Sequence, residues 1–321
     1  MSYSLHQIRW VCSTLFYMCT SFAIITANKS VLTIYKFPSV QFVTLVQLIV
    51  TVIVLEVLKL LRIVTFPALS VSSIRDVMPL PLIHLVNLLV GLGSTQSLSI
   101  PMFQVLRRFT VLFVMIGEIT ILRKRFSKLT VVTVVAMLGG VIIAFIGDLA
   151  YDSYGYTLVL LNDLFTAAYS IYLKKINDKK LMGKLGLMYY NSIISLPLSL
   201  LAFIISGEFQ TVKVYAGWSD SWFCAQFVLI NVLGFVLMYS AILCTAVCGP
   251  LTYNVAGVLK SAAITYIGML HWFGGDYIFS WLNFFGITVS ALGGVVYSAV
   301  TFRSLEQSRA DKNKKQEVYV A

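Results

Sequence analysis

The chain alternates between long apolar stretches and short polar segments. A helix that crosses a membrane needs about 20 mostly apolar residues, and stretches of this length recur along the whole sequence. We therefore predict an all-α polytopic membrane protein with ten transmembrane helices. They are expected at about 8–28, 39–61, 77–97, 100–122, 128–147, 155–174, 184–206, 221–244, 250–272 and 276–301.

The polar segments between these helices are too short to form a soluble catalytic domain. The two longest, near 62–76 and 207–220, hold about fifteen residues each, whereas domains usually need at least about 50 residues. Only 12% of the residues are charged, about half the share of a typical soluble domain. The five cysteines show neither a metal-site spacing nor a disulfide pattern. We expect no enzyme, no metal and no cofactor.

The basic residues are distributed unevenly between the two sides of the expected membrane. The net charge is +11, from 24 Lys and Arg against 13 Asp and Glu. With a cytosolic N-terminus, 18 of the 24 fall in cytosolic segments and three on the opposite side. This positive-inside bias predicts that both termini are cytosolic and that the number of helices is even. The charge therefore needs no nucleic-acid partner, and the end from 304 onward is expected to be a solvated cytosolic tail without fixed structure.

A weak internal repeat connects the two halves of the chain. Gly139-Gly140 and Gly293-Gly294 each lie in a Leu-Gly-Gly-Val string near the end of a half, and a proline and a cation, Arg107 or Lys260, stand upstream of each. Chance recurrence of small-residue strings is the alternative. If the repeat is real, each half has five helices and the second half is inverted, as in alternating-access transporters. The expected units are 1–150, 151–303 and the tail 304–321.

Two cations inside expected spans indicate an anionic ligand. Lys260 is the one charged residue between Pro250 and Trp272, and such a cation costs about 2.5–3.5 kcal/mol on insertion scales. Tyr253 and Gly257 share its helix face, and snorkelling to the membrane surface is the alternative for Lys260.

In the fourth expected helix, Arg107 follows Phe103 by one turn and offers a planar fork that suits phosphate oxygens. A pair with a buried acid, Glu118 or Asp163, is the alternative for Arg107. Arg108 points in another direction and is expected to pair rather than to bind the ligand.

The seventh expected helix begins with a cluster of aromatic and polar residues. Tyr189, Tyr190, Asn191 and Ser192 supply stacking faces together with amide and hydroxyl groups, which are the groups that recognise a planar base. Tyrosine is also common at membrane interfaces, and composition alone does not decide between the two interpretations.

Several long stretches make the chain resemble a known family. They are "NKSVLTIYKFPS", "LPLIHLVNLLVGLGSTQSLSIPMFQVLRRFT", "GYTLVLLNDLFTAAYSIYLKK", "GKLGLMYYNS" and "GGDYIFSWLNFFGI". The chain resembles the nucleotide-sugar transporters of the drug/metabolite transporter superfamily from about residue 8 to 303. It is most similar to the animal branch that carries UDP-glucuronate, UDP-N-acetylglucosamine and UDP-N-acetylgalactosamine. The resemblance implies ten helices, inverted repeats and exchange of a cytosolic nucleotide-sugar for a lumenal nucleoside monophosphate.

The resemblance also implies a set of substrate-binding residues. The family's base motif falls on Tyr189 to Ser192, with Ser192 where the guanine-reading members have Asn. Its sugar and phosphate motif falls on Gly257 to Ser261, with Ser261 where the UDP branch has Asn, so the sugar stays open. Together with the residues chosen from their helix faces, the predicted substrate-binding set is Tyr17, Asn28, Lys29, Phe103, Arg107, Tyr189, Tyr190, Asn191, Ser192, Tyr253, Gly257, Lys260 and Ser261.

These observations lead to one predicted function. The chain is expected to be an antiporter that carries a cytosolic UDP-sugar into the Golgi lumen in exchange for UMP, with the endoplasmic reticulum as the alternative compartment and a homodimer as an open alternative to a monomer. Its expected partners are the nucleotide-sugar, the nucleoside monophosphate and the lipid bilayer. An organic-phosphate exchanger of the same fold and a membrane receptor or scaffold are the alternatives.

Overall fold

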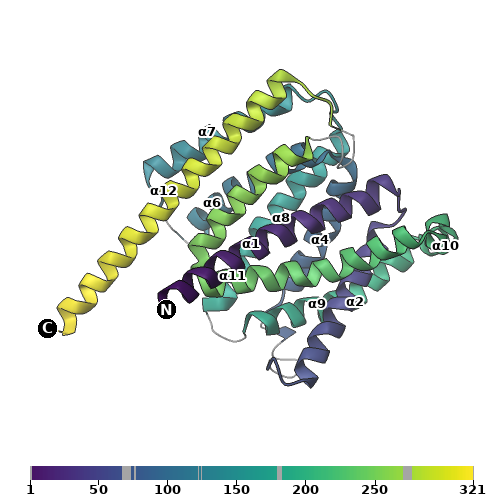
Figure 1. Cartoon of the computed structure of the whole chain (residues 1–321), viewed down its shortest axis with the longest axis horizontal. Helices are drawn as coiled ribbons and strands as arrows, with labels where there is room; N and C mark the ends of the chain where they lie inside the picture. Colours follow the sequence, from purple (N-terminus) through teal and green to yellow (C-terminus); the bar gives the residue numbers. More distant parts are fainter. Residues whose placement is uncertain are drawn as a thin grey trace.

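The computed structural model describes residues 2–66, 74–75, 77–121, 123, 125–178, 183–269 and 277–320. Over these residues the chain forms helices and no strand (Figure 1). The helices are α1 (Ser2–Lys29), η1 (Ser30–Ile34), α2 (Val40–Leu60), α4 (Leu80–Ser97), α5 (Ile100–Leu106), α6 (Phe109–Thr120), α7 (Lys128–Ile146), α8 (Ser153–Asp178), α9 (Lys184–Ile205), α10 (Phe209–Val214), η2 (Ala216–Ser219), α11 (Ser221–Gly268) and α12 (Trp281–Val320).

The predicted class, an all-helical polytopic membrane protein, is confirmed. Within the described ranges, seven helical stretches are long and apolar enough to cross a membrane. The expected helices at 77–97 and 155–174 are present as α4 and α8, but they are not among the seven. The number of ten transmembrane helices therefore stays a prediction.

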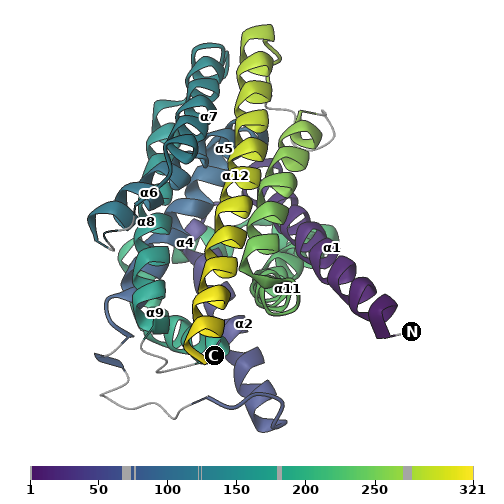
Figure 2. The ribbon, with the colours of Figure 1, turned by 90° about the vertical axis from the view of Figure 1, so that its left-hand side faces the viewer.

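Two of the expected boundaries differ from the structure. The expected helices 221–244 and 250–272 are joined in one helical element, α11, which is 48 residues long. Figures 1 and 2 both show that α11 changes direction in its middle and so has two arms. Backbone polar groups have no water to bind inside a membrane, so a bend that keeps most helical hydrogen bonds is favoured there over an open loop.

The second boundary is the end of the chain. The residues expected to form an unstructured tail instead extend α12 to Val320, and Figure 1 shows this end projecting from the helical bundle. The expectation of a tail without fixed structure was wrong. Its sequence contains Lys, Glu, Gln and Ala, which are strong helix formers.

The fourth expected helix is interrupted at its two arginines. Helix α5 ends at Leu106 and α6 begins at Phe109. The amide groups of Arg108, Thr110 and Val111 each donate to the carbonyl three residues earlier, at 3.1–3.2 Å, in place of the α-helical partner four residues earlier. This tighter winding is typical of functional hinges inside helices.

The Gly-Gly strings of the two halves pack helix α7 against helix α12. A Cβ atom added to Gly140 would lie 2.4 Å from the backbone nitrogen of Ser290, and one added to Gly293 would lie 2.8 Å from the Cα atom of Met137. The two helices lie side by side in both views (Figure 2). Small residues allow such backbone contact between membrane helices. Not every glycine is needed, since a Cβ atom on Gly139 would meet nothing within 4 Å.

Candidate functional site

Lys260 is held by two hydroxyl groups of α1. Its Nζ atom donates to Ser21 Oγ at 2.7 Å and to Tyr17 OH at 3.2 Å, and it lies 4.8 Å from the centre of the Tyr17 ring. Tyr17 and Ser21 are one helical turn apart, and both are buried. Hydroxyl groups and a ring face stabilise an ammonium group. They do not neutralise it, so none of these contacts supplies a negative charge to the ammonium group.

Gly257 belongs to the same group of residues. It lies one turn before Lys260, and a Cβ atom added to it would lie 3.9 Å from Tyr17 OH. The structure therefore brings together three of the expected residues: Tyr17, Gly257 and Lys260. Tyr253 lies in α11 as expected, but its side chain is outside the described residues.

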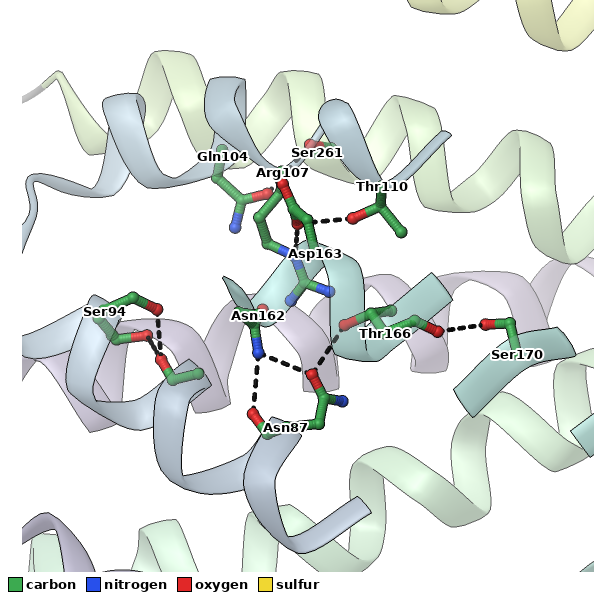
Figure 3. Close-up of polar contacts among 12 residues, drawn as sticks. Asn87, Ser94, Gln104, Arg107, Thr110, Asn162, Asp163, Thr166, Ser170 and Ser261 are labelled. Carbon is green, nitrogen blue, oxygen red and sulfur yellow. Dashed lines mark hydrogen bonds and ion pairs between the residues drawn. The ribbon is translucent and has the colours of Figure 1, made fainter. Parts of the chain in front are cut away.

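The next residue along α11 contacts α5. Ser261 Oγ donates to Gln104 Oε1 at 3.0 Å (Figure 3), and Gln104 is buried. Helices α1 and α5 thus both pack against the second arm of α11. Arg107 follows Gln104 by three residues, and Lys260 directly precedes Ser261, so this contact joins the chain segments that carry the two cations. Lys260 of α11 and Arg107 at the break between α5 and α6 therefore stand on segments that are in contact.

Arg107 contacts an aromatic ring and an acid. Its Cζ atom lies 5.7 Å from the centre of the Phe103 ring, and its Nε atom lies 3.9 Å from Asp163 Oδ1. The same oxygen accepts a hydrogen bond of 2.6 Å from Thr110 Oγ1 (Figure 3). The Arg107 side chain is 39% exposed, whereas that of Asp163 is fully buried. The acid that the sequence offered as an alternative partner of Arg107 is therefore beside it.

The expected roles of the two arginines are partly exchanged. We expected Arg108 to pair with an acid, but Arg107 is the one next to Asp163. Arg108 is buried, and its Nη1 atom has no hydrogen-bond partner within the described part of the chain. The expectation assumed an unbroken helix in which adjacent residues point 100° apart. The break between α5 and α6 changes those directions.

The two tyrosines of the expected base-binding motif, Tyr189 and Tyr190, share one hydrophobic cluster, whereas Tyr17 and Phe103 lie in two others. The ring centre of Tyr189 lies 4.5 Å from that of Phe66, and its hydroxyl donates to Glu56 of α2. Tyr190 is fully buried, which does not fit a tyrosine placed at a membrane surface.

Asn191 and Ser192 complete this motif and are also buried. Asn191 Nδ2 donates to Tyr169 OH at 2.8 Å. Its Oδ1 atom is buried and has no hydrogen-bond partner in the part of the chain that the structure describes.

Lys29 and Asn28 lie at the junction of α1 and η1. The Nζ atom of Lys29 donates to the backbone oxygen of Leu98 at 2.6 Å, just after the end of α4, where a cation complements the helix dipole. Lys29 is 1% exposed. Asn28 Oδ1 has no hydrogen-bond partner among the residues that the structure covers. Lys29 therefore has a structural contact, and its role towards substrate stays a prediction.

Four further residues that touch the site were not in the expected set. They are Ser21, Gln104, Thr110 and Glu56. Ser21 follows Tyr17 by four residues, so helical spacing places both on one face, and this signal was available. The partners of Gln104, Thr110 and Glu56 lie on other helices, and one sequence does not reveal such pairs. Among the described residues, no three His, Cys, Asp or Glu side chains form a group that could hold a metal ion.

Helices that pack around cations, with one helix broken at its cationic residue, are typical of membrane transporters. Residues 7–298 match the model of the Triose-phosphate Transporter family. The chain belongs to this family.

Animal relatives are similar to the chain over most of their length. It is 43% identical to UDP-sugar transporter UST74c of Drosophila melanogaster, over 92% of this chain and 79% of the relative. It is 44% identical to UDP-sugar transporter sqv-7 of Caenorhabditis elegans, over 92% and 89%, and 41% identical to nucleotide sugar transporter SLC35D2 of Homo sapiens, over 91% and 86%. The predicted resemblance to the animal UDP-sugar branch is confirmed, and the chain is a transporter and not an enzyme.

Proposed function

We propose that the protein exchanges a cytosolic UDP-sugar for lumenal UMP across the Golgi membrane, with the endoplasmic reticulum as the alternative compartment. The observation that carries the proposal is the arrangement of Lys260 and Arg107. Lys260 is hydrogen-bonded only to neutral hydroxyls in the contacts described, and the adjacent Ser261 contacts Gln104, which stands three residues before Arg107. A pyrophosphate is the part of a nucleotide-sugar that two such cations suit. The names of the relatives support a UDP-sugar as the substrate.

The proposed binding residues form two groups, one for the phosphates and sugar and one for the base. Arg107 and Lys260 bind the phosphates, and Tyr17, Gly257 and Ser261 line the phosphate and sugar end together with Tyr253. On α9, Asn191 presents its unpaired acceptor to the base, and the tyrosines before it supply stacking surfaces. The remaining members of the proposed set are Asn28, Lys29, Phe103 and Ser192.

We propose that residues 1–150 and 151–303 are inverted repeats that move against each other. In this scheme α2 and α9 are the second helices of the two halves, and α7 and α12 are the fifth. Each of these two pairs is in contact, which agrees with a two-fold axis that passes between the members of each pair. Both termini then face the cytosol, in agreement with the distribution of basic residues.

Exchange follows from the charges in the site. Two cations near each other are unfavourable when no anion is present, because each raises the energy of the other. An anionic ligand removes this penalty and allows the loaded carrier to pass through its closed state. The empty carrier therefore returns slowly, and exchange is favoured over one-way transport.

Counterflow in liposomes tests the proposal. Purified protein is reconstituted, and uptake of radiolabelled UDP-sugars is compared between vesicles preloaded with UMP and vesicles without it. We expect uptake to be several times faster with UMP inside. Equal uptake under the two conditions would remove the exchange mechanism, and absence of uptake for every UDP-sugar would remove the proposed substrate class.

An organic-phosphate exchanger is the second candidate, because two cations alone would also bind a sugar phosphate. The two functions differ in their need for the base. Competition by free UMP and by triose phosphate distinguishes them. Inhibition by UMP alone supports the nucleotide-sugar function, and inhibition by triose phosphate alone supports the second candidate.

A further inference from the structure

Asp163 of α8 is a buried acid that the exchange mechanism above does not use. Its carboxylate is fully buried, and its Oδ1 atom lies 3.9 Å from Arg107 Nε. We infer that Asp163 is the internal counter-ion of Arg107 in the substrate-free carrier, and that the pyrophosphate of the substrate takes its place. This inference rests on the proposed function.

The geometry indicates a pair that can be exchanged rather than a permanent ion pair. Permanent Arg–carboxylate pairs are usually bidentate, with two parallel hydrogen bonds of about 2.7–2.9 Å. Here one carboxylate oxygen approaches one guanidinium nitrogen at 3.9 Å. Figure 3 shows the two terminal nitrogens of Arg107 pointing away from Asp163. The face of the guanidinium group that binds phosphate best is thus directed elsewhere.

The surroundings of Asp163 hold its carboxylate in place without neutralising it. Thr110 donates to Oδ1. The second oxygen, Oδ2, is buried and has no hydrogen-bond partner within the described residues. A buried carboxylate that keeps its charge needs a cation nearby. Arg107 supplies that cation in the empty state, and the pyrophosphate competes with Asp163 for it when the substrate binds.

This arrangement has a consequence for binding and for exchange. The carboxylate repels the incoming phosphates, so it weakens binding of the substrate. It also reduces the penalty of the unpaired arginine, so it allows some return of the empty carrier. Asp163 is a positioning residue that acts through Arg107. It sets the affinity for the substrate and the degree to which uptake depends on a counter-substrate.

Asp163→Asn keeps the shape of the side chain and removes its charge. We expect the variant to bind UDP and UMP about tenfold more tightly, because repulsion between like charges is lost. We also expect the ratio of uptake with internal UMP to uptake without it to rise at least twofold. Titration calorimetry on the purified full-length carrier measures the first effect and liposome uptake measures the second. Unchanged or weaker nucleotide binding by this variant would overturn the inference.

Asp152→Asn is the matched control. Asp152 stands before the first turn of the same helix, where its carboxylate accepts from the backbone nitrogens of Tyr154 and Gly155. Asn is equally suited to such a helix cap. The change removes the same charge from the chain, and both affinity and the uptake ratio are expected to stay at the wild-type value. Tighter binding in this control as well would attribute the effect to net charge and overturn the inference.

A double variant shows whether Asp163 acts through Arg107. In the Arg107→Gln background, Asp163→Asn should no longer increase affinity. Asp163→Asn alone should lower the melting temperature of the ligand-free protein, because it leaves a cation without its partner, and the double variant should recover it. A double variant that melts no higher than Asp163→Asn would overturn the pairing, even if the single variant folds too poorly for transport assays. Failure of the wild-type protein to bind any nucleotide would contradict the proposed function instead.

Discussion

Ser21 of α1 accepts a hydrogen bond of 2.7 Å from Lys260 of α11, and these two residues are 239 positions apart in the chain. The contact joins the first helix to the helix that carries the cation proposed to bind phosphate. Tyr17 adds a second, longer bond of 3.2 Å and its ring. The ammonium group therefore has two hydrogen-bond partners when no ligand is present, and both are neutral hydroxyls.

Replacing Lys260 with Gln should separate binding from folding. We expect UDP affinity to fall at least tenfold, since a charge-assisted contact contributes about 1.5–3 kcal/mol. The ligand-free protein should melt no lower than wild type, because a charged group inside a membrane protein is itself unfavourable. Calorimetric titration and thermal unfolding measure the two quantities.

Lys213→Gln serves as the control for this change. Lys213 lies in the last turn of the short helix α10 and is exposed, so the variant alters the net charge by the same amount. It should bind UDP like wild type. Wild-type affinity in Lys260→Gln would contradict the role of Lys260.

The two hydroxyl groups that hold Lys260 should differ in importance. Ser21→Ala removes the shorter hydrogen bond and should lower the free energy of unfolding by about 1.5–3 kcal/mol, the range for a bond to a charged group. Tyr17→Phe removes the longer bond but keeps the ring face beneath the ammonium, so its effect should be smaller. Thermal unfolding of both variants without ligand makes the comparison. A larger loss for Tyr17→Phe would show that the hydroxyl of Tyr17, rather than its ring, is the main support.

Part of this site could be read from the sequence and part could not. The positions of Gly257 and Lys260 on one face follow from helical spacing, because neighbours three or four residues apart share a face whatever the rest of the chain does. The spacing of Tyr17 and Ser21 likewise predicts that these two residues share one face of α1. The pairing of α1 with α11 cannot be predicted from helical spacing, because the faces that meet depend on contacts between segments far apart in the chain.

The two arginines and the long α11 show where local reasoning fails. The helix break between α5 and α6 redirected Arg107 towards Asp163, and no turn-forming glycine or proline marks the break in "VLRRFT". Conversely, Pro250 suggested the start of a new span, but the chain passes it within one helical element. A membrane interior favours helical hydrogen bonding, and this preference outweighs the local signals on which the boundaries were based.

Asn191 should control the choice of base. Its buried Oδ1 lacks a hydrogen-bond partner among the described residues, so in the proposed complex it accepts from the base. We expect Asn191→Ala to bind UMP and CMP with nearly equal affinity. Loss of one such contact should weaken the binding free energy of UMP by about 0.5–1.5 kcal/mol. Competition by nucleoside monophosphates in the uptake assay measures this preference.

Tyr169→Phe is the companion variant to Asn191→Ala. It removes only the hydroxyl to which Asn191 Nδ2 donates and leaves the amide in place. The preference for UMP over CMP should be largely kept. If both variants lose it equally, Asn191 serves to position the helix and not to recognise the base.

The neighbouring glycines of α7 offer a matched pair for the contact between α7 and α12. A methyl group on Gly140 would lie 2.4 Å from a backbone atom of α12, whereas one on Gly139 would meet nothing within 4 Å. Gly140→Ala should lower the free energy of unfolding by about 1–3 kcal/mol, the usual range for overpacking. Gly139→Ala should be neutral or slightly stabilising, because alanine is the better helix former. Thermal unfolding of the two variants in the same detergent measures the difference, and equal melting temperatures would mean that α7 and α12 do not pack backbone against backbone.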